Sequence, residues 1–306
     1  MQNDILIFDR NRVRLNRDRA ARQSRKDGGH HDFMHDWAVR ALMNRLSDVK
    51  RDFDLALLIG ATGSKSLLQQ QKIGTLIQMD LSAEHLKNNI GEHVQLSLQG
   101  SEEFLPFAPQ SLDLILSPLT LHTVNDLPGA LLQIRQTLKP DGLFLAAMLG
   151  GETLHELRSV MMDAEMNLRG GISPRIAPFA DKPQAGALLQ RAGFNLPVID
   201  SEIITVTYEN AFRLMQDVRF MGEGNAILKR DTKFTGRDLF TEAARLYHER
   251  FSGPDGRINA TFEIIFMIGW APHESQQKPL RPGSATARLA DVLGSTEIGT
   301  GESTGT

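Results

Sequence analysis

A glycine turn and a carboxylate stand 20 residues apart, in the order that nucleotide-binding sites use. Gly60 opens the turn directly after the apolar run 55–59, and Asp80 ends the next apolar run, 75–79. Backbone N–H groups of such a turn bind a nucleotide at the start of a helix, and a carboxylate after the second strand accepts hydrogen bonds from a ribose. The two residues therefore predict a nucleoside-bearing ligand.

The turn Gly60-Ala61-Thr62-Gly63 does not match either complete phosphate-binding loop. A dehydrogenase loop would place its third glycine at Ser66, and a Walker A loop would need glycines at Ile59 and Ser64. A tight turn that needs glycine only for its backbone angles explains the same residues. Ligand binding and a purely structural turn both stay open on these residues alone.

His122 is the candidate catalytic residue. It follows the fourth apolar run, 112–116, and stands beside Asn125 and Asp126. In a parallel sheet this position is the carboxyl edge, where ligands bind. A histidine there can act as a general base or bind the substrate. The alternative is a histidine that is bonded to the backbone of its own loop.

A second group of residues has the types that could bind a metal ion: His30, His31, Asp32, His35 and Asp36. His31 and His35 share a face of a helix, and two histidines with one carboxylate can bind non-heme iron. The group stands at the junction with the N-terminal segment, outside the predicted crevice, and Phe33 and Trp37 predict a helix that packs beside it. We therefore expect no metal site.

Short apolar runs alternate with amphipathic stretches in the first half of the chain. The runs predict strands at 55–59, 75–79, 94–98, 112–116 and 143–148, and the amphipathic stretches predict helices at 65–71, 83–89 and 127–138. Asn125 or Asp126 caps the last of these helices. Such alternation is typical of a parallel sheet that helices cover on both faces.

Longer helices follow in the second half of the chain. Thr153 and Glu156 have the spacing of a capping box, which predicts the start of a helix that ends at Gly170. Residues 169–179 are either a lid over the crevice or an ordinary connector. Further helices are predicted at 184–192, 211–221 and 237–251, and strands at 203–207 and 261–269.

The composition is that of a globular protein. Its 306 residues are 41% hydrophobic and include 34 Lys and Arg against 37 Asp and Glu, a net charge of −3. Cysteine is absent, which excludes disulfide scaffolds, Cys-ligated metals and thiol nucleophiles. No apolar run approaches the roughly 20 residues that cross a bilayer. We expect no transmembrane segment and leave peripheral membrane association open.

Charge and polarity divide the chain into three predicted parts. Residues 1–31 carry eight Lys and Arg against four Asp and predict a basic N-terminal arm. The arm either docks to an acidic or RNA partner or is a solvated face; the negative net charge favours the second, and we expect no nucleic-acid partner. Residues 32–273 are the predicted domain, and 274–306 predict a largely disordered tail.

Several longer segments resemble one family of proteins. They are residues 7–10, 102–107, 119–128, 139–142, 150–154, 173–179, 267–270 and 282–285. Together they are similar to the class I methyltransferase-fold family that contains the mitochondrial complex I assembly factor 5. A more distant relative in the same superfamily methylates a malonyl thioester.

The resemblance implies a Rossmann-like α/β fold, with a seven-stranded, mostly parallel sheet and a C-terminal antiparallel hairpin. It implies S-adenosylmethionine (SAM) as the cofactor. It also implies a protein substrate, an arginine of an NADH dehydrogenase (complex I) subunit that is methylated or hydroxylated. The implied cofactor-binding positions are Gly60, Thr62, Ser64, Asp80, Leu81, Ser101, Glu102 and Ser117.

The sequence departs from the family pattern where the cofactor would bind. Leu58 and Ser101 stand where the family has acidic residues, and Thr62 and Ser64 stand where it has glycines. A hydrogen bond to a charged group contributes about 1.5–3 kcal/mol, so losing two carboxylates costs about 3–6 kcal/mol of binding free energy. We predict that SAM binding is weak, altered or lost.

Three functions stay open. The chain modifies an arginine of a complex I subunit, or it is a non-catalytic assembly chaperone that has lost the cofactor. The third is an NAD(P)-dependent oxidoreductase, which rests on the glycine turn and Asp80. The resemblance implies a bacterial cytoplasm or, alternatively, the matrix side of the mitochondrial inner membrane.

Overall fold

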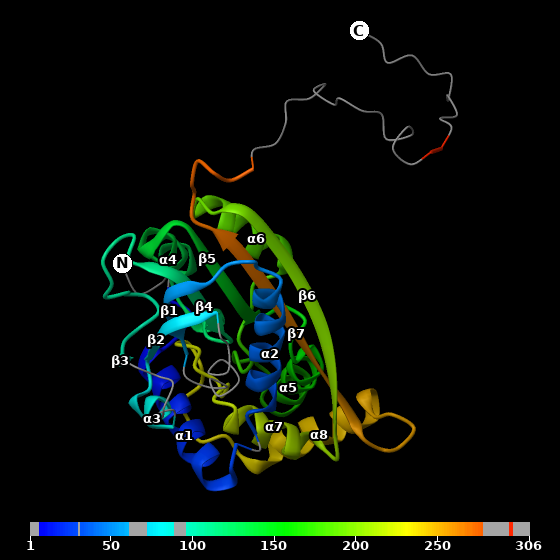
Figure 1. The fold of residues 1–306 in the computed structure, drawn as a ribbon. Helices are drawn as coiled ribbons and strands as arrows, with labels where there is room; N and C mark the ends of the chain where they lie inside the picture. Colours follow the sequence, from blue (N-terminus) through cyan, green and yellow to red (C-terminus); the bar gives the residue numbers. More distant parts are fainter. Residues whose placement is uncertain (1–5, 30, 61–71, 89–95, 278–293, 296–306) are drawn as a thin grey trace. The chain divides into compact units, whose positions relative to one another are not determined.

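Seven strands form one sheet in the order β3-β2-β1-β4-β5-β7-β6 (Figure 1). The pairs among β1 to β5 are parallel, whereas β7 is antiparallel to β5 and β6. The predicted α/β class and the C-terminal hairpin are confirmed. In this computed structural model the strands are β1 (Phe53–Ile59), β2 (Ile73–Asp80), β3 (Leu96–Gln99), β4 (Leu112–Pro118), β5 (Leu138–Leu149), β6 (Asn195–Tyr208) and β7 (Ile258–Trp270).

The structure describes residues 6–29, 31–60, 72–88, 96–277 and 294–295. The predicted helix at 65–71 and most of the predicted tail lie outside these residues. Residues 1–272 form one compact unit and residues 273–306 a second. The helices are α1 (Arg10–Asp27), α2 (Phe33–Ser47), α3 (Ala83–Lys87), the 3-10 turn η2 (Leu121–Thr123), α4 (Leu127–Thr137), α5 (His155–Arg169), α6 (Lys182–Arg191), α7 (Ala211–Phe220) and α8 (Arg237–Phe251).

Helices cover both faces of the sheet, and the side chains of β5 show why its sequence is apolar throughout. Leu143 and Leu145 pack into the cluster that contains residues of α2, α5, α7 and α8. Phe144 and Ala146 face the other way, into the cluster that contains residues of α4 and α6. A strand that is buried on both faces needs apolar residues at every position. No helix in the described part of the chain is long and apolar enough to span a membrane.

The start of α5 differs from the prediction, because Thr153 and Glu156 bind strand β7 and do not cap the helix. Leu154 precedes the helix at φ 53°, and no side chain caps it. Thr153 Oγ1 donates to the carbonyl of Glu263, and Glu156 accepts from the backbone and hydroxyl of Thr261. Tertiary partners have displaced the predicted local capping box.

Strand β6 begins earlier than the predicted 203–207. It is the edge strand of the sheet, and the prediction missed its first part. Its first eight residues include Pro197 and the polar residues Asp200 and Glu202. An edge strand tolerates a proline and exposed polar side chains, so alternation does not reveal it. Helix α8 and the end of α5 at Gly170 agree with the prediction, and Asp126 caps α4 by accepting from the N–H of Gly129.

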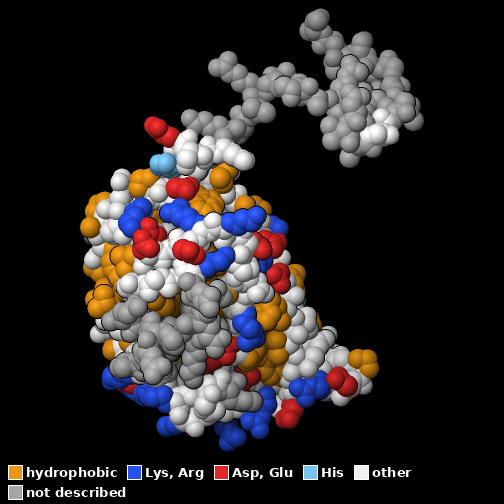
Figure 2. Space-filling view, in the orientation of Figure 1, with side chains coloured by type: hydrophobic (Ala, Val, Ile, Leu, Met, Phe, Trp, Pro, Cys, Tyr) orange, Lys and Arg blue, Asp and Glu red, His pale blue; other side chains and the backbone are white. Residues whose placement is uncertain are grey.

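The basic N-terminal segment is a folded helix of the first unit. Asp9 caps α1 by accepting from the N–H of Arg12, and the helix contacts α3 and α7. One face is exposed and basic, and Lys and Arg side chains gather along the lower edge of Figure 2, where Figure 1 shows α1. The other face is buried and includes Arg17 and Asp18. The prediction of a solvated face therefore holds for the exposed side of α1 and not for its buried side.

Candidate functional site

The strand order reverses between β1 and β4, and a crevice outside the carboxyl ends of these strands is where open α/β sheets bind ligands. Three of the predicted cofactor-binding residues lie at this edge. Gly60 follows β1, Asp80 ends β2, and Ser117 is the next-to-last residue of β4. The predicted Thr62 and Ser64 lie outside the described residues.

Gly60 packs against the loop after β4. Its φ is +98°, and a Cβ at this position would lie 2.4 Å from Cγ2 of Thr120. Ser117 is fully buried, and its hydroxyl pairs with that of Thr120 at 2.6 Å. Backbone conformation and close packing therefore account for glycine at position 60, as the structural alternative expects.

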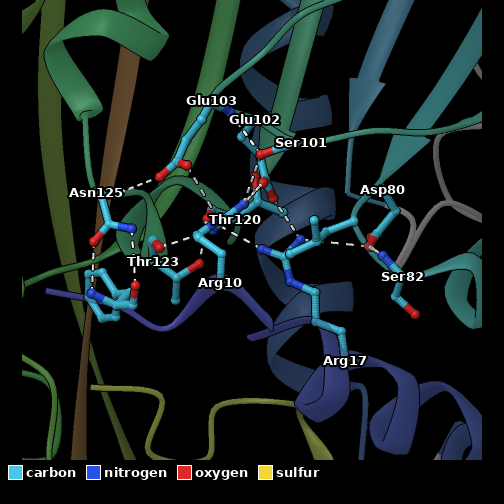
Figure 3. Close-up of polar contacts among 12 residues, drawn as sticks. Arg10, Arg17, Asp80, Ser82, Ser101, Glu102, Glu103, Thr120, Thr123 and Asn125 are labelled. Atoms are coloured by element: carbon cyan, nitrogen blue, oxygen red, sulfur yellow. Dashed lines mark hydrogen bonds and ion pairs between the residues drawn. The ribbon is translucent and has the colours of Figure 1, made fainter. Parts of the chain in front are cut away.

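Two arginines of α1 hold the acidic residues of the predicted cofactor site (Figure 3). Arg17 Nη1 lies 2.6 Å from Oε1 of Glu102 and 3.6 Å from Oδ1 of Asp80. Arg10 pairs with the other carboxylate oxygen of Glu102 and donates to the carbonyl of Thr123. Both carboxylates are buried. A helix from the start of the chain thus neutralises charges that lie at the edge of the sheet.

The ion pairs keep both acids charged. Burial would raise the pKa of Asp80, but Arg17, His85 and the N–H of Ser82 lower it well below its ordinary value. Burial likewise opposes ionisation of Glu102, whose pKa Arg17 and Arg10 lower. The same carboxylates raise the pKa of Arg17 above its ordinary value. At neutral pH the group is therefore an ionised cluster whose charges neutralise one another.

The remaining predicted cofactor residues also have partners within the protein. The Ser101 hydroxyl accepts from the N–H of Glu103 at 3.2 Å and from Arg10 at 3.4 Å. The carbonyl of Leu81 accepts from the side chain of Gln99 at 3.2 Å. Leu58, at the position where the family has an acid, is fully buried in the sheet core.

The described residues leave only a small cavity beside Asp80. The cavity bounded by Arg17, Gly60, Asp80 and Thr120 has a volume of about 10 Å³, room for about one water molecule. Arg17, His85 and the N–H of Ser82 already contact Asp80, so a ribose would have to compete with them.

His122 lies on the other side of Thr120 and forms a pair with Glu223. Its Nε2 is 3.0 Å from Oε2 of Glu223, and its ring meets the ring of Phe179 edge to face, with centroids 5.6 Å apart. Nδ1 is buried and has no hydrogen-bond partner among the described residues. The partner of His122 is thus a carboxylate that lies 101 residues away in the sequence. The structural alternative expected a bond to the backbone of its own loop.

Glu223 was not identified from the sequence. It follows α7, between Gly222 and Gly224, and this placement between two glycines is the only local sign that its position matters. Burial opposes its ionisation, but His122, His35 and Arg17 outweigh burial and lower the pKa of Glu223. Glu223 is therefore an anion at neutral pH.

A larger cavity of about 240 Å³ lies on the far side of Glu223. Most of its wall is apolar and includes Leu149, Leu154 and Phe179, and its polar lining includes Glu223 and Arg175. Residues 175–177 and Phe179 form one wall, so the segment proposed as a lid or connector borders a cavity. A second hollow of about 560 Å³ shares Ile176 and Phe179 with this cavity.

The predicted histidine group does not come together as a unit. His31 Nδ1 pairs with Asp217 at 2.6 Å, whereas His35 lines the small cavity beside Arg17 and Glu223. The sequence interpretation placed both outside the crevice, which is wrong for His35. Burial lowers the pKa of His35 to about 4, so it is neutral at physiological pH. Among the described residues, no group of three His, Asp or Glu side chains could hold a metal ion.

Comparisons with known proteins agree with this fold. Residues 57–146 match the model of a methyltransferase domain. The YcgJ protein of Bacillus subtilis has a similar structure, with a TM-score of 0.53, 16% identity, and coverage of 76% of this chain and 99% of that one. The sheet and these matches define a protein of the methyltransferase fold.

Sequence similarity narrows the class further. The chain is 39% identical to "Arginine-hydroxylase NDUFAF5, mitochondrial" of Danio rerio over 289 residues, 94% of this chain and 89% of that protein. It is 30% identical to a malonyl-[acyl-carrier protein] O-methyltransferase of Methylovorus over 288 residues, 89% of this chain and 92% of that one. The chain belongs to the arginine-hydroxylase NDUFAF5 family, as the resemblance predicted.

Proposed function

We propose that this protein modifies an arginine side chain of a protein partner, a subunit of NADH dehydrogenase. The family supports an arginine substrate, because its relatives are named arginine hydroxylases. The observation that carries the proposal is the apolar cavity of about 240 Å³ at the carboxyl edge, which adjoins a wider hollow. An arginine side chain suits the first, and the polypeptide on either side of it suits the second.

Mass spectrometry of the partner tests the proposal directly. NADH dehydrogenase subunits would be isolated from cells with and without the gene, and their arginine-containing peptides compared. A gain of one oxygen at one arginine identifies hydroxylation, and a gain of one methylene identifies methylation. Identical arginine masses in every subunit would contradict the proposal.

We further propose that SAM binds weakly or not at all. The ion pairs of Asp80 and Glu102 with α1 support this, together with Leu58 at the position of an acid. A ligand that binds the folded chain raises its stability by RT ln(1 + [L]/Kd), so weak binding predicts little thermal shift with SAM or S-adenosylhomocysteine. A low-micromolar dissociation constant for SAM by calorimetry would contradict this part.

A second candidate function, a non-catalytic assembly chaperone, is favoured by the same occupied site. The Arg17 ion pairs would equally exclude the ribose of NAD(P), so the oxidoreductase interpretation gains no support. A chaperone should still support NADH dehydrogenase assembly after His122→Asn, whereas an enzyme should show reduced arginine modification. Subunit mass spectra and assembly, measured in the same cells, separate the two functions. The compartment, a bacterial cytoplasm or a mitochondrial matrix, stays part of the proposal.

A further inference from the structure

Glu223 is the carboxylate that borders both cavities of the site. It lines the small cavity with Arg17 and Asp80, and it lines the large cavity with Phe179 and Arg175. We propose that Glu223 binds the guanidinium of the substrate arginine and that His122 positions it. This inference rests on the proposed function, because it gives that function its specificity-determining residue.

The shape and lining of the large cavity suit an arginine side chain. Leu149, Leu154 and Phe179 can contact the three methylenes, whose burial is favourable. Glu223 offers the anion for the guanidinium, which forms strong, directional hydrogen bonds to carboxylates.

Glu223 is the only acidic residue among the described residues that line the large cavity. Two arginines line this cavity, Arg175 and Arg219. Nη2 of Arg175 lies 2.6 Å from Oε1 of Glu165, so the charge of Arg175 is already compensated. Arg219 is exposed, and no ion pair of its side chain is found among the described residues. Glu223 gives one carboxylate oxygen to His122, and no hydrogen bond to its Oε1 is found among the described residues. Glu223 therefore retains a carboxylate oxygen that a cationic group can bind.

His122 acts on the ligand through Glu223. Its Nε2–H donates to Oε2, and the rings of His122 and Phe179 pack edge to face, so one carboxylate oxygen is held and Oε1 is left for a ligand. His122 is therefore a positioning residue. Its effect on ligand binding should disappear when Glu223 no longer carries a charge.

The entrance explains how an arginine within a protein could reach Glu223. The outer hollow shares Ile176 and Phe179 with the inner cavity, and its wall includes Leu6 and Ile7, which are 41% and 42% exposed. A flanking segment of the partner would contact these apolar residues while its arginine enters the inner cavity. Free arginine, without flanking residues, should therefore bind less tightly than a peptide.

Binding of small probes tests the assignment. N-acetyl-arginine-N-methylamide and its citrulline analogue have nearly the same shape, but only the first carries a charge. Calorimetry should show that wild type binds the arginine probe more tightly than the citrulline probe. Glu223→Gln should lower the affinity for the arginine probe at least tenfold without changing citrulline binding. The matched control is Glu249→Gln, on the exposed face of α8 beside Arg245, which removes the same charge and should bind like wild type. Equal affinity of Glu223→Gln and wild type for the arginine probe would overturn the proposal.

His122→Asn tests the positioning role. As a single substitution it should lower the affinity for the arginine probe severalfold. Added to Glu223→Gln it should have no further effect on that affinity, because the coupling passes through Glu223. Additive losses in the double variant would overturn this role. If Glu223→Gln does not fold, Glu223→Asp retains the charge at a shorter reach and should still prefer arginine over citrulline, with lower affinity than wild type.

The outcomes separate this inference from the function on which it rests. If the subunit arginine is modified equally by wild type and Glu223→Gln, the function stands and the role of Glu223 is wrong. If Glu223→Gln loses the arginine probe while no subunit is modified in wild-type cells, Glu223 binds guanidinium and the proposed function is wrong.

Discussion

Two sets of carboxylates lie at the carboxyl edge of the sheet, and they differ in what neutralises them. Asp80 and Glu102 are held by Arg17 and Arg10, beside a cavity of about 10 Å³. Glu223 is held on one side by His122 and borders a cavity of about 240 Å³ on the other. The protein satisfies the first set internally and leaves the second able to accept a ligand.

This difference indicates which carboxylate of the site is able to bind a ligand. A buried charge is stable only when it is paired, and a protein that supplies the pair itself removes that charge from ligand binding. A carboxylate with one oxygen unpaired, next to an apolar cavity, is instead suited to a cationic guest. Substitutions in each of the two sets test the difference separately.

The largest effect is expected from Arg17→Met. It removes the cation that Glu102 and Asp80 share and leaves Glu102 with Arg10 alone, which costs about 3–5 kcal/mol of unfolding free energy. Denaturant unfolding measures the loss. Arg22→Met is the matched control on the same helix, because Arg22 is 59% exposed and lies 3.8 Å from Glu84; it should change stability by less than about 1 kcal/mol. A loss no larger than that of the control would mean that the cluster contributes little to stability.

Lowering the pH should narrow the difference between wild type and Arg17→Met. The pKa of Asp80 and that of Glu102 are lowered in the folded chain. Their contribution is therefore complete above the unfolded-state pKa of about 4 and is lost as the pH falls through the folded-state values. Urea unfolding at about pH 7 and about pH 3 measures this change. A stability difference that stays constant across this range contradicts an ionic origin.

A smaller effect is expected from Gly60→Ala. The new methyl group would meet Cγ2 of Thr120, and alanine would have to adopt φ +98°; strain of this kind costs about 1–3 kcal/mol. Thr120→Ser removes Cγ2 and should restore part of the stability in the double variant. Thermal unfolding of the single and double variants measures both. No recovery would mean that the clash with Thr120 is not what requires glycine.

The sequence predicted the parts of the fold that depend on local patterns. Alternating apolar strands and helices identified the sheet, and Asp126 was recognised as a helix cap because its partner, Gly129, is three residues away. Thr153 and Glu156 misled for the opposite reason, since their partners Glu263 and Thr261 lie in a strand about a hundred residues later. Local propensity does not contain such contacts.

The site was predictable only in outline. Strand ends placed Asp80, Ser117 and His122 at one edge, but nothing in the spacing showed that Arg17 reaches Glu102 across 85 residues. The His122 contact with Glu223 spans 101 residues and was equally hidden. An arginine in a basic helix looks like surface charge until its carboxylate partner is placed in space.

The contrast between the two carboxylate sets is tested most directly by carboxyl carbon NMR of wild-type protein during titration with N-acetyl-arginine-N-methylamide. The account predicts a saturable shift of the Glu223 side-chain resonance. The resonances of Asp80 and Glu102 should not shift, because Arg17 and Arg10 already pair with these two carboxylates. Shifts at Asp80 and Glu102 with none at Glu223 would contradict it.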